Sequence, residues 1–178
     1  MEIVIHTILM MLLAMALLGA AISDVQRSRI PNVITLPLTG LGLGLHSILN
    51  GWEGLLFSLE GFGVGFGLLL LFYAGGGMGA GDVKLLGAVG AVIGPSDVFV
   101  AFLATATLGG LYAIALMILT WGFPKTAERV KTILTTWVLT RSFALASSSS
   151  TTVQPKLRYG LVIGLGTLCT QGWQWVGG

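Results

Sequence analysis

The feature that most constrains this chain is a series of long apolar segments separated by short polar stretches. Hydrophobic residues make up 54% of the 178 residues, charged residues only 9%, and the mean hydropathy is +0.92. An ordinary soluble domain contains about 25% charged residues. The composition therefore predicts a polytopic membrane protein and excludes a typical soluble enzyme or nucleic-acid-binding domain.

The apolar segments have the length of membrane helices. A helix needs about 20 residues to cross a hydrocarbon core about 30 Å thick, whereas barrel strands would be short and alternate in polarity. We therefore predict an all-α polytopic membrane protein with six transmembrane helices. They are expected over Ile3–Ile22, Val33–Leu49, Leu55–Ala74, Val83–Ile93, Val98–Thr120 and Leu157–Trp175. The fourth is too short to cross unless it takes residues from the glycine run before it.

The basic residues predict the orientation. All nine lysines and arginines lie in or beside the loops 23–32, 75–82 and 121–156, which six spans place on one face. The positive-inside rule makes that face cytoplasmic. We therefore expect a multi-pass protein of the cell inner (cytoplasmic) membrane with both termini outside. The residues are Arg27, Arg29, Lys84, Lys125, Arg129, Lys131, Arg141, Lys156 and Arg158.

The longest loop, 121–156, is predicted to contain a cytoplasmic amphipathic helix between the fifth and sixth spans. Apolar residues recur there with helical spacing, and basic residues lie between them, so the helix is expected to lie on the inner leaflet. A Ser/Thr-rich link, "ASSSSTTVQP", follows it. We expect one integral-membrane domain over 1–178. The apolar positions are Val130, Ile133, Leu134, Trp137 and Val138.

Two aspartates lie at the predicted cytoplasmic boundary. Asp24 ends the first span, and Asp82 begins the fourth after the glycine-rich stretch 75–81. Ionisable groups at such positions are candidates for a functional site. Two neighbouring carboxylates can share one proton, so one can activate water while the other polarises a peptide carbonyl. A purely structural role is the alternative, in which they cap helices and pair with Arg27 and Lys84.

The sequence around these aspartates resembles the type IV prepilin peptidase family. "SDVQRSRIPN" (23–32) is similar to the first motif of that family, and "GAGDVKLL" (79–86) resembles its Gly-x-Gly-Asp-x-Lys-Leu motif. "RYGLVIGLG" (158–166) is similar to a segment that opens the last span, with Arg158 in place of a frequent proline. The resemblance implies an intramembrane aspartyl endopeptidase that removes a short basic leader from prepilins or pseudopilins, with Asp24 and Asp82 as catalytic residues.

The same resemblance implies substrate-binding roles for three further residues. Gly79 and Gly81 would let the substrate backbone approach Asp82, although they would also serve simply to break the helix. Lys84 would attract an acidic substrate residue or anchor the helix at the interface. The expected partners are the N-terminal segment of a prepilin and membrane lipid, with no nucleic acid. Cys169 is the single cysteine, so we expect no cysteine zinc site, and no metal or cofactor.

Larger family members carry a C-x-x-C insert after the first span, which is associated with N-methylation. Here that interval is filled by Val25 to Pro31, so methyltransferase activity is not expected. The compact form resembles enzymes of tight-adherence (Flp) pilus systems or archaeal preflagellin peptidases. The pattern leaves open two other classes, a small ion- or proton-coupled transporter that uses the two aspartates and a non-catalytic assembly scaffold. Neither the particular prepilin nor the oligomeric state is specified.

Overall fold

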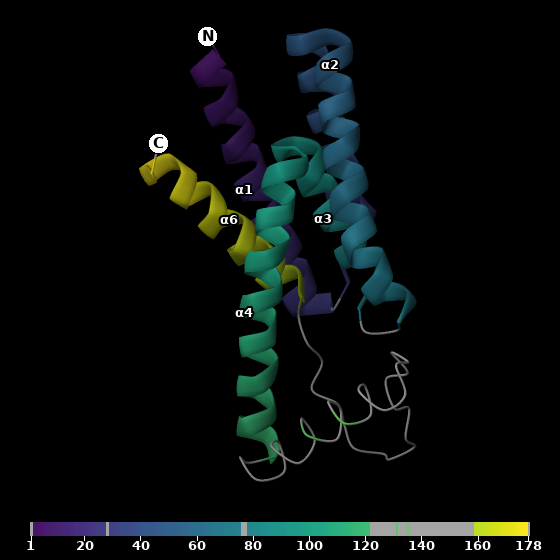
Figure 1. The fold of residues 1–178 in the computed structure, drawn as a ribbon, viewed down its shortest axis with the longest axis vertical. Coiled ribbons are helices and arrows are strands. Elements are labelled where there is room, and N and C mark those ends of the chain that lie inside the picture. The colour runs from purple at the N-terminus through teal and green to yellow at the C-terminus, as the bar shows by residue number, and fades with distance from the viewer. Residues whose placement is uncertain are drawn as a thin grey trace.

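The computed structural model describes residues 2–27, 29–75, 78–121, 131, 135 and 159–177. Within these ranges the regular structure is entirely helical, which confirms the all-α prediction (Figure 1). The helices are α1 (Glu2–Arg27), α2 (Asn32–Ala74), α3 (Ala80–Ile93), α4 (Pro95–Trp121) and α6 (Tyr159–Gly177). Apart from positions 131 and 135, the predicted amphipathic helix and the Ser/Thr-rich link lie outside the described residues.

Helix α2 is a hairpin of two arms that reverses at Gly51. Gly51 has φ 58° and ψ −133°, a conformation that glycine adopts without steric cost. The rings of His46 and Phe57 lie 5.2 Å apart, whereas a straight helix would separate these positions by about 16 Å along its axis. In Figure 1, α2 turns over at the top of the molecule. Its arms correspond to the second and third predicted spans.

Helix α3 lies at the centre of the molecule and carries Asp82 in its first turn (Figure 1). From Val83 to Ile93 every residue except Lys84 is buried, as expected for a helix that is apolar on all sides. Small residues allow close packing against α2. A Cβ added at Gly61 would lie 2.0 Å from the carbonyl oxygen of Gly90, so the two backbones are in direct contact.

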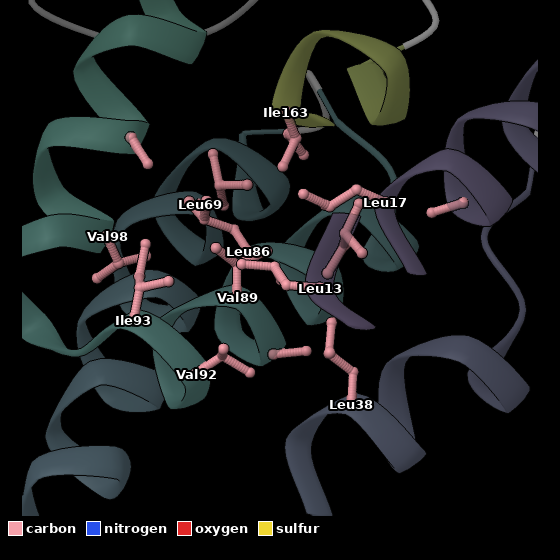
Figure 2. Packing of buried hydrophobic residues seen from close by; sticks show 14 of the residues in the cluster. Leu13, Leu17, Leu38, Leu69, Leu86, Val89, Val92, Ile93, Val98 and Ile163 are labelled. Atoms are coloured by element: carbon pink, nitrogen blue, oxygen red, sulfur yellow. The ribbon is translucent and has the colours of Figure 1, made fainter. Parts of the chain in front are cut away.

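Side chains from every described helix meet around α3 to form the core. Figure 2 shows the apolar side chains of the neighbouring helices converging on Leu86 and Val89 of α3. This packing fixes α3, and therefore Asp82, relative to α1 and α6. The labelled core residues are Leu13 and Leu17 of α1, Leu38 and Leu69 of α2, Val92 and Ile93 of α3, Val98 of α4 and Ile163 of α6.

The outer surface is apolar, but six membrane-crossing helices are not confirmed. In the described part of the chain, three stretches are long and apolar enough to cross a membrane, namely Thr7–Arg27, Asn32–Ala74 and Pro95–Leu116. Helix α3 has 14 residues, about 21 Å of helix, which is shorter than the hydrocarbon core. It begins at Ala80 and so takes only the end of the glycine run. The apolar part of α6, Gly160–Gly172, is also short.

Candidate active site

Helix α1 brings Asp24 into the interior because the aspartate continues the buried face of the helix. Buried positions recur every three or four residues at Leu9, Leu13, Leu17, Ala20 and Asp24, and Asp24 is only 7% exposed. The opposite face carries exposed methionine and leucine side chains. This 3.6-residue periodicity directs the carboxylate toward the other helices rather than toward lipid or water.

The Asp24 carboxylate lies at the start of α6. The Gly160 N–H donates a hydrogen bond to Asp24 Oδ2 at 3.0 Å. Gly160 is the second residue of α6, and the first N–H groups of a helix have no partner within it. They also form the positive end of the helix dipole. The start of α6 therefore holds the Asp24 carboxylate in a defined position.

Asp82 closes the first turn of α3. Its Oδ2 accepts a hydrogen bond from the Gly79 N–H at 3.3 Å, while the Asp82 N–H donates to the Gly79 carbonyl at 3.1 Å. The side chain is 9% exposed. Reciprocal bonds of this kind satisfy free backbone groups at a helix start. The glycine-rich segment thus gives Asp82 a defined orientation.

The two carboxylates interact electrostatically. Burial, followed by the negative charge of Asp24, raises the pKa of Asp82 from 3.8 to about 6, and the Gly79 N–H opposes this shift. Asp82 precedes the predicted fourth span. The start of a helix favours the ionised form of a carboxyl group, but burial outweighs that effect on Asp82. The effect of Asp24 on this pKa means that its carboxylate lies within electrostatic range of Asp82.

The predicted substrate-binding glycines have different surroundings. Gly79 is exposed, and a Cβ added there would lie 3.2 Å from Asp82 Oδ2. A Cβ at Gly81 would lie 3.1 Å from Ile30 Cβ, so part of the protein already occupies the space beside this glycine. Whether either glycine contacts substrate stays a prediction.

Lys84 is exposed, and its Nζ donates to Asn32 Oδ1 at 3.2 Å. In the described part of the chain, the hydrogen-bond partners of Asp24 and Asp82 are the backbone N–H groups of Gly160 and Gly79. Among the described residues neither carboxylate bonds to Arg27 or Lys84, although Asp82 does cap the start of α3, as a structural role would require. Lys84 links the start of α2 to α3 instead.

Sequence reasoning missed Gly160 and Ile30 as site residues. The Tyr-Gly sequence at 159–160 was a signal for the first, since it marks the opening of the last helix. Nothing in the sequence pairs Gly160 with Asp24, because the two positions lie 136 residues apart. Ile30 reads as an ordinary apolar residue before a proline.

An apolar cavity that is open to the surface is lined by residues of the same helices as Asp24 and Gly160. It has a volume of about 240 Å³ and lies between α1, α4 and α6. Val25 and Leu161 are the chain neighbours of Asp24 and Gly160, but the Asp24 carboxylate itself does not line the cavity, because consecutive residues of a helix point to different sides. Its lining is Val25, Leu108, Tyr112, Leu161, Val162 and Leu165. The described residues contain no group of three or more histidine, cysteine, aspartate or glutamate side chains that could hold a metal ion.

The fold and the site define an all-helical, strongly apolar protein with two interacting buried carboxylates from separate helices. Comparison with known protein families then shows to which family the chain belongs. The model of the type IV leader peptidase family matches residues 11–114, and both aspartates fall within that range. The chain belongs to the type IV leader peptidase family.

The curated relatives carry a double name. A prepilin leader peptidase/N-methyltransferase from Aeromonas salmonicida (strain A449) is 31% identical over 120 residues, which cover 64% of this chain and 41% of that protein. A protein of the same name from Aeromonas hydrophila gives the same figures. The chain thus spans about two fifths of the length of these relatives. The expected lack of methyltransferase activity stays a prediction. No solved structure matches the chain.

Proposed function

We propose that this protein is an intramembrane aspartyl endopeptidase that removes the short basic leader from prepilins or pseudopilins at the cytoplasmic face of the membrane. The observation that carries the proposal is the interaction between the buried carboxylates of Asp24 and Asp82. Family membership supports the same chemistry. The proposal treats the chain as a single membrane domain of the inner membrane with both termini outside, and in Figure 1 the two termini lie in the same half of the molecule.

The surroundings of the two carboxylates favour different roles in peptide hydrolysis. Asp24, which accepts the Gly160 N–H, serves as the base and takes a proton from water as the water oxygen attacks the peptide carbonyl carbon. Asp82 is the protonated partner and donates its proton to the carbonyl oxygen. When the tetrahedral intermediate collapses, the C–N bond breaks. Asp24 then gives its proton to the leaving nitrogen, and Asp82 recovers one from the hydroxyl group.

The open cavity between α1, α4 and α6 offers a place for an apolar substrate side chain. Its volume of about 240 Å³ exceeds that of the roughly 150 Å³ apolar cavity that binds benzene in another protein. A large apolar residue of the substrate would therefore fit. Gly79 has no side chain and so leaves room for the substrate backbone. Lys84 has three N–H donors and donates to the Asn32 side chain, so further donors can bind an acidic substrate residue.

The test is cleavage of a co-expressed prepilin from the same genome, followed by gel shift and N-terminal sequencing. Wild type should trim the leader, whereas Asp24→Asn and Asp82→Asn should each accumulate full-length prepilin while remaining inserted in the membrane. Asp97→Asn is the matched control, because Asp97 lies in the first turn of α4 and should be dispensable. Continued trimming without either site carboxylate would refute the mechanism and favour the transporter or scaffold.

A further inference from the structure

The connection between α1 and α2 is attached at both ends. The Ser23 hydroxyl donates a hydrogen bond to the Arg29 carbonyl at 3.0 Å, which ties the connection to the end of α1. At the other end, Lys84 of α3 donates to the Asn32 side chain at 3.2 Å. Ile30 lies between these two attachments and is partly buried against the core. Its position is therefore set by α1 and α3 together.

Ile30 contacts the glycine beside each carboxylate. A Cβ added at Gly81, the residue before Asp82, would lie 3.1 Å from Ile30 Cβ and 3.3 Å from Ile30 N. A Cβ added at Gly160, which donates to Asp24, would lie 3.1 Å from Ile30 Cδ1. The base of the side chain thus packs on α3, and its terminal methyl group packs on α6.

We infer that Ile30 is a positioning residue, a spacer between α3 and α6 that sets the separation of the Asp24 and Asp82 carboxylates. The inference rests on the proposed function, since the separation matters only if the pair acts on one peptide bond. The residues that Ile30 contacts on α3 and α6, Gly81 and Gly160, have no side chains, so the space between the helices is filled by Ile30 alone at these two positions. Catalytic geometry is sensitive to displacements of about 1 Å, which is the scale of change that shortening Ile30 would produce.

Three substitutions test the spacer in graded steps. Ile30→Ala removes most of the side chain, Ile30→Val removes only Cδ1, the atom that faces Gly160, and Ile30→Leu keeps the number of carbon atoms. We expect kcat to fall by at least about tenfold in the alanine variant, with KM nearly unchanged, because positioning acts on the transition state. The valine variant should be intermediate. The leucine variant should remain within about threefold of wild type, since volume-conserving changes are tolerated best.

The diagnostic readout is the pH dependence, which a merely structural role would not move. When the spacer is shortened, water enters the space that the missing atoms leave and hydrates the two carboxylates. Both causes of the raised pKa of Asp82, its burial and the charge of Asp24, then weaken. The alkaline limb of the rate profile should therefore move to lower pH in Ile30→Ala and, by less, in Ile30→Val. Ile48→Ala is the matched control, because Ile48 is 81% exposed on α2.

An unchanged alkaline limb in the valine and alanine variants would overturn the inference, even if their rates fall. The Asp82 carboxyl can also be titrated by carbon-13 NMR, which needs no activity and so remains informative if the alanine variant is inactive. Failure of the proposed function looks different. In that case the wild type does not cleave prepilin, or Asp24→Asn still does, while the effect of Ile30 on the Asp82 titration remains measurable.

Discussion

The contact between Gly61 and Gly90 predicts that a single methyl group will separate α2 from α3. A Cβ at Gly61 would lie 2.0 Å from the Gly90 carbonyl oxygen and 2.9 Å from Gly94 Cα. These are backbone atoms in a buried interface and cannot rotate away. Ordinary contact begins at 3.4 Å, so the helices would have to part by the difference, 1.4 Å.

The expected cost follows from this displacement. Overpacking a core costs about 1–3 kcal/mol, and Gly61→Ala should lie at or above the top of that range because backbone must move. Gly63 provides a matched control on the same helix, since a Cβ there meets nothing within 4 Å. In Gly63→Ala the gain in helix propensity should stabilise the protein by about 0.5–1 kcal/mol. The two variants should therefore differ by at least about 3 kcal/mol.

The assay is unfolding in detergent micelles, followed by far-ultraviolet circular dichroism, with cleavage measured on the same samples. Gly61→Ala should unfold at markedly lower temperature than wild type and lose activity, because α3 carries Asp82. Gly63→Ala should match or exceed wild type in both measurements. Equal midpoints for the two alanine variants would refute the direct contact between the backbones of α2 and α3.

Two further predictions concern the chemistry and the substrate. The cleavage rate should fall by about tenfold per pH unit above about 6. Burial and the charge of Asp24 raise the pKa of Asp82 to about 6, so Asp82 loses its catalytic proton above that pH. A rate that is constant from pH 6 to 8 would contradict this. Leu165→Trp should fill the cavity between α1, α4 and α6 and raise KM several-fold. Leu168→Trp, at an exposed position on the same helix that does not line the cavity, should not. Equal KM values would remove the cavity from substrate binding.

Local patterns were enough to predict the helices, and helical periodicity explains the burial of Asp24 that the structure shows. Continuous apolar segments gave the positions of α1, α4 and α6, and the spacing of Leu13, Leu17 and Asp24 on one face of α1 follows from helical periodicity. The two segments that form the arms of α2 were also recognised. Their joining by a reversal at Gly51 depends on a single positive φ, which glycine permits but does not require.

Long-range contacts were beyond the sequence. Glycine pairs at four-residue spacing look alike in the sequence, but the structure separates them into two kinds. Gly61 and Gly65 contact the α3 backbone, whereas Gly63 and Gly67 have open space around them. Spacing identifies a helix face, but which face meets a neighbour depends on how the helices pack. The contacts of Ile30 with both glycine neighbours of the site depend on tertiary structure in the same way.

The central claim, that Asp24 and Asp82 form an interacting pair, can be tested by direct titration. The sequence contains three aspartates, at 24, 82 and 97, so carbon-13 labelling of aspartate carboxyl groups gives few signals to assign. In wild type the Asp82 signal should titrate near pH 6, because burial and the charge of Asp24 both raise its pKa to about 6. In Asp24→Asn its midpoint should move to lower pH while staying above 3.8, since burial remains. An Asp82 midpoint that is identical in the two proteins would show that the carboxylates do not interact.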